Sequence, residues 1–186
     1  LGCAYDMGFG VKRNAHKAVT WYGKAAHQGH VTAQFNLGAA YISGDGVSKK
    51  NRKLAFMWFR EAAEKGDSDA QCNLGVAYAT GDGLEKNQEL ALVWYRRAAE
   101  QNHARSQYNL GTAYDVGAGV ERNPRKAVAW YQKAAEQGHV SAQYNLAVSY
   151  DIGDGAKKKH RAGYCLVSKR SETGSRQITG SGRGVG

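Results

Sequence analysis

Apolar and small residues return along the chain at a nearly constant step of 36 or 37 residues. Four leucines mark one position of this pattern: Leu37, Leu74, Leu110 and Leu146. The four tryptophans mark a second position: Trp21, Trp58, Trp94 and Trp130. A period of roughly 20–50 residues is typical of repeat proteins, in which stacked units share one continuous core. The pattern therefore predicts a solenoid.

Each copy is expected to form two antiparallel helices. In the first helix, Ala142, Leu146, Ala147 and Tyr150 follow the spacing of a single buried stripe. Earlier copies carry a glycine where the last copy has Ala147, at Gly38, Gly75 and Gly111. Glycine costs about 1 kcal/mol in a helix interior relative to alanine. We therefore expect the backbone to approach a neighbouring helix closely at this position.

Glycines and asparagines bound the second helix. A Gly-x-Gly turn ends the first helix, and an asparagine is then expected to cap the start of the second, at Asn14, Asn51, Asn87 and Asn123. The buried face of the second helix is expected to carry Ala127, Val128, Trp130, Tyr131, Ala134 and Ala135. Residues in the left-handed backbone conformation are expected to end the second helix, at Gly29, Gly66, Asn102 and Gly138.

The repeated motif is Ala-Gln-Tyr-Asn-Leu-Gly-x-x-Tyr-x-x-Gly-x-Gly-Val, followed by Lys-Ala-x-x-Trp-Tyr-x-Lys-Ala-Ala-Glu-x-Gly, and it is most complete over residues 106–140. It resembles the Sel-one-like repeats, which are relatives of the tetratricopeptide repeats. The resemblance implies an all-α fold, a right-handed α-solenoid of antiparallel helix pairs that acts as an adaptor for protein partners. The final copy departs from the motif, because it has Ala147 and lacks the second-helix pattern.

We expect two regions. Residues 1–155 form the array, of about four units with the first and last incomplete, and residues 156–186 form a basic, Gly/Ser-rich tail that is expected to be disordered. The formal charge is +10, but the tail alone holds eight Lys/Arg and one Glu. The repeats are thus nearly balanced in charge. A nucleic-acid partner is expected only if it binds the tail, through residues 157–161.

The side of the first helix opposite its stripe offers a candidate binding groove. At about 100° per residue, three ladders of side chains point away from the core: Phe35/Cys72/Tyr108/Tyr144, Asn36/Asn73/Asn109/Asn145 and Ile42/Ala79/Asp115/Asp151. An asparagine amide both donates and accepts, so it can pair with the backbone of an extended peptide. The same amides could instead join neighbouring repeats, which would make the ladder structural.

The candidate partner-binding residues are Asn36, Asn73, Tyr108, Asn109, Thr112, Asp115, Tyr144, Asn145, Val148 and Asp151. Within the third ladder, Asp115 and Asp151 belong to the C-terminal copies. This gradient suggests a ligand segment that is basic or carries an N-terminal amine.

Other motifs fit structural roles better than chemical ones. His30, His103 and His139 recur at one register, at least one repeat apart, too far to share a metal ion at bonds of about 2 Å, and we expect them at solvent-exposed helix starts. One aspartate in each Gly-Asp-Gly turn falls short of the roughly six to eight oxygens that calcium takes. Gln34, Gln71, Gln107 and Gln143 are expected to make inter-helix hydrogen bonds. We predict no catalytic residue, cofactor or metal.

The three cysteines do not follow the repeat. Cys3 and Cys72 should lie farther apart than the roughly 7 Å between Cα atoms that a disulfide allows, which weakly favours a reducing compartment. No apolar run reaches the about 20 residues needed to span a membrane. The sequence leaves the oligomeric state open. We expect a non-catalytic scaffold that binds an extended peptide or partner protein; the alternative is a regulatory or targeting region of a larger enzyme, with its catalytic domain before Leu1.

Overall fold

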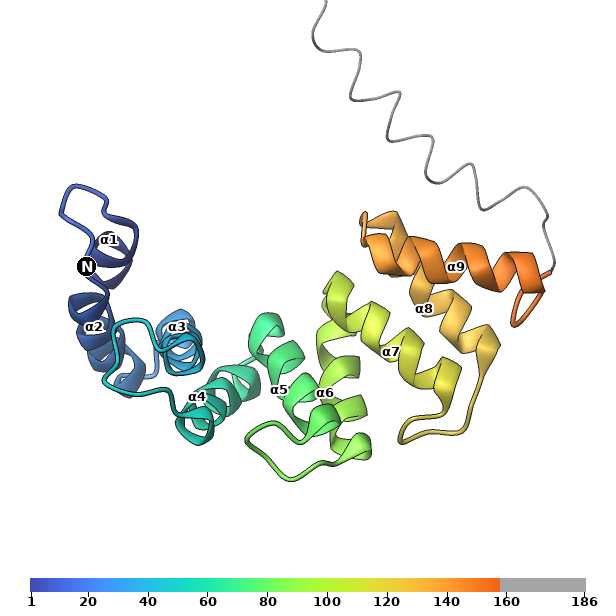
Figure 1. Cartoon of the computed structure of the whole chain (residues 1–186), viewed down its shortest axis with the longest axis horizontal. Helices are drawn as coiled ribbons and strands as arrows, with labels where there is room; N and C mark the ends of the chain where they lie inside the picture. Colours follow the sequence, from blue (N-terminus) through green and yellow to red (C-terminus); the bar gives the residue numbers. More distant parts are fainter. Residues whose placement is uncertain (158–186) are drawn as a thin grey trace, which may run out of the picture.

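The computed structural model of the protein describes residues 1–157. That part of the chain contains nine helices and no strand: α1 (Gly2–Met7), α2 (Ala15–His27), α3 (Val31–Ser43), α4 (Arg52–Glu64), α5 (Ser68–Thr80), α6 (Gln88–Glu100), α7 (Ala104–Val116), α8 (Pro124–Glu136) and α9 (Val140–Ile152). Each helix packs mainly on its neighbours along the chain. The helices form an arc, with α3 above α4 and α9 above α8 on its open side (Figure 1). The predicted all-α solenoid of helix pairs is confirmed.

Two expectations fall beyond this range. The predicted disorder of the tail and the predicted loss of a second helix in the final copy both concern residues that lie outside the described part of the chain.

A glycine and an aromatic ring hold the two helices of each pair together. A Cβ atom added at Gly75 would lie 2.6 Å from the ring of Tyr95, and one added at Gly111 would lie 2.7 Å from the ring of Tyr131. Real Cβ atoms do not come this close to other atoms, so only glycine admits the ring. The predicted close approach is confirmed, and Ala147 occurs in α9, which no described helix follows.

The ring that packs on the glycine is not the tryptophan. Tyr131 is fully buried, whereas the preceding Trp130 is half-buried and Trp21 is 37% exposed. The expectation that tryptophan belongs to the buried face holds only in part, because Trp130 packs against the core while remaining partly exposed. Successive helical residues differ by about 100°, so the tryptophan lies at the edge of the face. There the cation of Lys133 lies 4.2 Å from the centre of the Trp130 ring, a favourable cation–π geometry.

Side chains cap both helices of a pair. The Oδ1 atom of Asn123 accepts a hydrogen bond from the backbone N–H of Lys126 at 3.0 Å, and Pro124 takes the first helical position, as predicted. The three other predicted asparagine caps are also present, at Asn14, Asn51 and Asn87. The first helices begin instead at a histidine or an aspartate: His30, Asp67, His103 and His139.

The buried glutamines connect successive repeats. Gln71 donates from Nε2 to the carbonyl oxygen of Ala63 at 3.0 Å, and its Oε1 accepts from Gln101 at 2.8 Å. It thereby links α5 to the ends of α4 and α6. Gln107 makes the same pair of bonds one repeat later, with Ala99 and Gln137. The expected inter-helix role of these glutamines is confirmed.

Candidate functional site

The first helices α3, α5, α7 and α9 each carry an asparagine at the same register: Asn36, Asn73, Asn109 and Asn145. We call the surface that carries them the groove face. All four are half-buried. Within residues 1–157, the side chains of Asn36, Asn73 and Asn109 have no hydrogen-bonding partner. The alternative in which these three amides join neighbouring repeats has no contact to support it.

A hollow of about 250 Å³ lies between α3 and α5, and we call it the apolar hollow. Its walls and floor are Ala39, Ile42, Phe56, Phe59, Asn73, Val76, Ala77 and Thr80, with Asp82 at the following turn. Asn73 is thus placed beside an apolar cavity. The hollow is large compared with the roughly 30 Å³ that one water molecule occupies, so it can take a side chain.

A second hollow of about 250 Å³ lies between α1 and α3, and we call it the acidic hollow. Its lining includes Asp6, Tyr22, Asn36, Ser43 and Asp45 and no lysine or arginine. The Tyr22 hydroxyl donates to Oδ2 of Asp6 at 3.1 Å. Burial raises the pKa of Tyr22, and Cys3 and Asp6 beside it raise it further, so the phenol stays protonated as the donor.

Asp6 is a groove-face residue that the sequence interpretation missed. It occupies the register of Ile42, Ala79, Asp115 and Asp151, as the preceding Tyr5 indicates. Acidic side chains therefore stand at both ends of this ladder and apolar ones in its middle. The expected rise in acidity toward the C-terminal copies is wrong.

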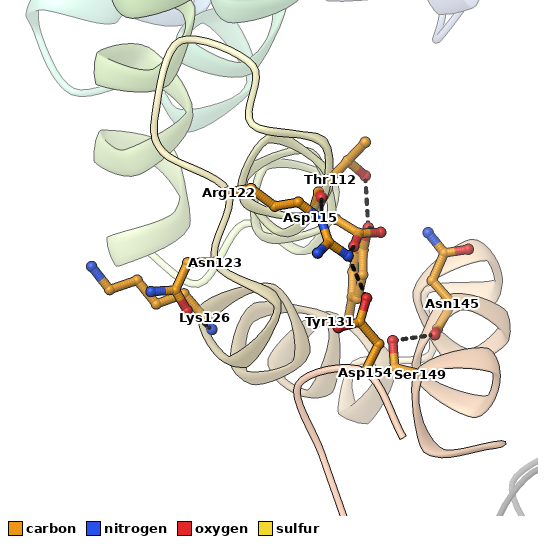
Figure 2. A network of polar contacts seen from close by, with 9 residues as sticks. All are labelled: Thr112, Asp115, Arg122, Asn123, Lys126, Tyr131, Asn145, Ser149 and Asp154. Atoms are coloured by element: carbon orange, nitrogen blue, oxygen red, sulfur yellow. Dashed lines mark hydrogen bonds and ion pairs between the residues drawn. The ribbon is translucent and has the colours of Figure 1, made fainter. Parts of the chain in front are cut away.

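A polar network occupies the groove face at α7 (Figure 2). The Tyr131 hydroxyl lies 3.3 Å from both Thr112 Oγ1 and Asp115 Oδ2. Arg122 donates from Nε to the backbone oxygen of Asp115 at 2.8 Å and pairs with Asp154 in the next turn. Burial raises the pKa of Tyr131, whereas its hydrogen bonds with Thr112 and Asn145 act in the opposite direction. Two of the predicted site residues, Thr112 and Asp115, thus meet at one phenol.

Four predicted site residues lie on α9, namely Asn145 of the groove face and three exposed ones. Tyr144 is 69% exposed, and Val148 and Asp151 are also exposed. Tyr108 differs from Tyr144, since its ring is half-buried, stacks on His139 at 4.7 Å and tilts against Tyr131 at 5.9 Å. The expectation that Tyr108 points away from the core is therefore wrong, because its ring packs against the core cluster. Its neighbour in the ladder, Cys72, is buried.

The turn aspartates pair with arginines of the preceding repeat, which lie in its turn or, for Arg52, at the start of α4. Arg13 contacts Asp45 at 2.6 Å, and Arg52 contacts Asp82 at 3.0 Å. These pairs explain the recurring aspartates without a metal ion. These ion pairs could have been inferred from the sequence, because Arg13–Asp45 and Arg122–Asp154 share a spacing of 32 residues.

The histidines begin the first helices, as predicted, but His103 and His139 are half-buried rather than exposed. Their Nδ1 atoms act as caps, accepting from backbone N–H groups of the following turn. Among the described residues, no group of three or more His, Cys, Asp or Glu side chains could hold a metal ion. Cys3 and Cys72 are free thiols, as expected. Within residues 1–157, no helix combines the length and apolarity required to cross a bilayer.

Comparisons with known proteins agree with the helical array. The model of the Sel1 repeat matches five consecutive stretches, residues 1–30, 31–67, 68–103, 104–139 and 140–166. A Sel1 repeat protein from Oxalobacter formigenes is 40% identical, with a TM-score of 0.86 over 93% of this chain and 68% of that one. A protective antigen of uropathogenic Escherichia coli with the SLR fold is also 40% identical, with a TM-score of 0.87.

The second of these structures is much longer than the present chain, which covers 37% of it and is itself covered to 93%. Cysteine-rich protein B of Helicobacter pylori is more distant, at 25% identity and a TM-score of 0.57 over 73% of this chain and 97% of that one. No curated protein matches the sequence.

Proposed function

The chain belongs to the Sel1 repeat family, whose members generally act as scaffolds for protein interactions, and we propose that it is a non-catalytic scaffold binding an extended segment of a partner protein along the groove face. The observation that carries this proposal is the row of amides at Asn36, Asn73 and Asn109, which recur once per repeat and have no partner within residues 1–157. An amide that both donates and accepts satisfies the backbone of an extended chain whatever its sequence.

The candidate residues near these amides differ from repeat to repeat and supply the means of selection. Thr112 and Asp115 offer polar atoms at α7, while Tyr144, Val148 and Asp151 offer an exposed, mainly apolar face on α9. Tyr108 on α7 and Asn145 on α9 lie beside the polar network around Tyr131. A scaffold of this kind uses constant amides to hold the backbone and variable neighbours to choose the side chains.

Removing two of the free amides tests the proposal. Peptides that bind the full chain are selected from a displayed library of random twelve-residue sequences, and their affinities are measured by fluorescence anisotropy. The double variant Asn73→Ala/Asn109→Ala should bind them about tenfold or more weakly, because two hydrogen bonds contribute about 0.5–1.5 kcal/mol each and 1.4 kcal/mol is tenfold in affinity.

The control is Gln132→Ala, which removes an exposed amide from α8. Its affinity for the same peptides should match that of the unchanged chain. Equal binding by the double variant and the control would contradict the proposal, as would a library from which no peptide is enriched.

A further inference from the structure

We propose that the acidic hollow and the apolar hollow together select a two-residue signature in the bound segment. A lysine or arginine side chain enters the acidic hollow, and a large apolar side chain enters the apolar hollow about three residues away. This inference rests on the proposed function, and it specifies the chemistry of the partner segment.

The acidic hollow has one carboxylate, that of Asp6, that no cation in the described part of the chain neutralises. Arg13 pairs with Asp45, and toward Asp6 it donates only to the backbone oxygen. Among residues 1–157, no basic side chain lies within ion-pair distance of the Asp6 carboxylate. The Tyr22 hydroxyl occupies one position on this carboxylate and leaves the others open. A cationic side chain entering between α1 and α3 would complete the pair.

Polar acceptors extend from Asp6 across the same hollow. Asn36 carries its free amide on one wall, and Ser43 and Asp45 lie at the end of α3. An ammonium group has three donors and a guanidinium group has five. The lining therefore offers both charge and hydrogen-bond acceptors to a lysine or arginine.

The apolar hollow differs in kind. Ile42 occupies the register of Asp6 in this hollow. Phe59 occupies the register of Tyr22 and lacks the hydroxyl that Tyr22 directs at Asp6. Its single charged residue, Asp82, pairs with Arg52 at 3.0 Å. Burying a leucine-sized side chain in such a site is favourable, at about 25 cal/mol per Å² of apolar surface. The free amide of Asn73 at its wall can hold the peptide backbone beside that side chain.

The two hollows adjoin, because Ala39 lines both. The hollows lie on two sides of α3, and a helix with its side chains is about 10–12 Å across, so the hollows should be about that far from each other. An extended chain rises about 3.3 Å per residue. The two anchoring side chains should therefore be separated by about three residues.

The C-terminal end of the groove face does not repeat this arrangement. Asp115 occupies the register of Asp6 and contacts Tyr131 in the same way, but the guanidinium of Arg122 lies 4.0 Å from its carboxylate. Its charge is thereby partly compensated. The free charge of Asp6 thus gives the N-terminal end its selectivity for a cation.

The test uses the random twelve-residue library against the full chain. Enriched peptides should carry Lys or Arg and a Leu, Ile, Met or Phe about three residues away, in a single chain direction. Replacing the basic residue of a selected peptide by alanine should weaken binding about fivefold, as for a partly exposed ion pair. Replacing its apolar residue by alanine should weaken binding more than tenfold.

Matched variants of the protein locate the two contacts. Asp6→Asn keeps an acceptor for Tyr22 and removes the charge, so it should reproduce the fivefold loss and abolish the preference for a basic residue. Val76→Arg should block the apolar hollow and reproduce the larger loss. The controls are Glu89→Gln and Val93→Arg, which make comparable changes at exposed positions of α6 away from the groove face, and each should change affinity less than twofold. Circular dichroism of each variant verifies the helical fold.

The outcomes separate this inference from the proposed function. If peptides are enriched and depend on Asn73 and Asn109, but lack the signature or ignore Asp6→Asn and Val76→Arg, the scaffold proposal stands and this inference is overturned. Controls as damaging as the matched variants would overturn it too. If no peptide is enriched, both proposals fail.

Discussion

The junction of α5 with α7 and the junction of α7 with α9 occupy the same place in successive repeats but are built from different side chains. The first contains Asp69, Cys72 and His103, and we call it the cysteine junction. The second contains Arg105, Tyr108 and His139 at the same registers, and we call it the tyrosine junction. In both, the histidine Nδ1 accepts a backbone N–H at 3.2 Å and so begins the next helix.

The two junctions differ first in size. Cys72 is 1% exposed, so a small thiol fills its site completely. Tyr108 places a whole ring in the equivalent site, stacked on His139 with the two planes 21° apart. The helices of the two junctions have equal lengths, and the second helix of each junction begins at a histidine. Local packing must therefore adjust by small shifts that leave the backbone pattern unchanged.

They differ also in charge. In the cysteine junction, the Cys72 side chain raises the pKa of His103 through a hydrogen bond, and Asp69, 3.1 Å from Nε2, adds to this effect against the opposing influence of burial. In the tyrosine junction, burial lowers the pKa of His139 and the charge of Arg105 lowers it further. The pKa values of two equivalent caps thus shift in opposite directions, first through Cys72 in one junction and burial in the other, and the opposite charges of Asp69 and Arg105 add to each shift. The histidine cap is thus the same in both junctions, whereas the charged side chain beside it differs.

The largest expected effect follows from exchanging the side chains that fill the junctions. Tyr108→Cys removes a ring that contacts both Tyr131 and His139 and should lower the free energy of unfolding by about 2–3 kcal/mol. The converse change, Cys72→Tyr, forces a ring into a filled site and should cost about 1–3 kcal/mol. Urea unfolding followed by circular dichroism measures both.

Tyr144→Cys is the matched control, because Tyr144 has the same register and is 69% exposed. It should change stability by no more than about 0.5 kcal/mol. A Tyr108→Cys protein as stable as this control would show that the ring contributes nothing to the tyrosine junction.

The junctions also show which features could be predicted from the sequence. Asn123 was predictable as a cap, and Gly111 as a point of close approach, because each depends on one residue type at one backbone position. The choice between Trp130 and Tyr131 as the core ring was not, since both are aromatic and adjacent. The side chains of Trp130 and Tyr131 point in directions about 100° apart. Only the position of the helix that carries the glycine decides which of the two is buried.

Features of the candidate site divide in the same way. Periodicity placed Asn36, Asn73 and Asn109 on one face, but the hollows beside them depend on the sizes of side chains from three helices. The groove-face position of Asp6 could have been predicted from the sequence, because Asp6 follows Tyr5 as Asp115 follows Tyr114. The pairing of Arg122 with Asp154 joins two turns that come together only when the repeats stack.

A smaller effect is expected when the charges of the junctions are exchanged. Arg105→Asp should raise the pKa of His139 by about one unit, and Asp69→Arg should lower that of His103 by a similar amount, because a nearby charge shifts a histidine pKa by about one to three units. NMR titration of the histidine ring protons measures each value. In the unchanged chain His103 should titrate at higher pH than His139, and the double exchange should bring the two pKa values closer together. An unchanged difference between them after the exchange would remove these two charges from the explanation.

The smallest effect concerns stability against pH. The folded pKa of His139 lies below the unfolded value of about 6.5, so its contribution to stability is present above that pH and is lost as the pH falls through the folded pKa. The folded pKa of His103 lies above the unfolded value, so its contribution to stability is present below about pH 6.5 and is lost as the pH rises through the folded pKa.

His139→Asn, which keeps a cap without a titrating group, should therefore flatten the acid side of the melting-temperature profile. His103→Asn should flatten the neutral side, and each change should amount to about 1 kcal/mol or less, since one unit of pKa shift corresponds to about 1.4 kcal/mol. Calorimetric melting between about pH 5 and 8 follows both variants. Identical profiles for the two would mean that the junctions do not differ electrostatically, and the contrast between Asp69 and Arg105 would then have no consequence for folding.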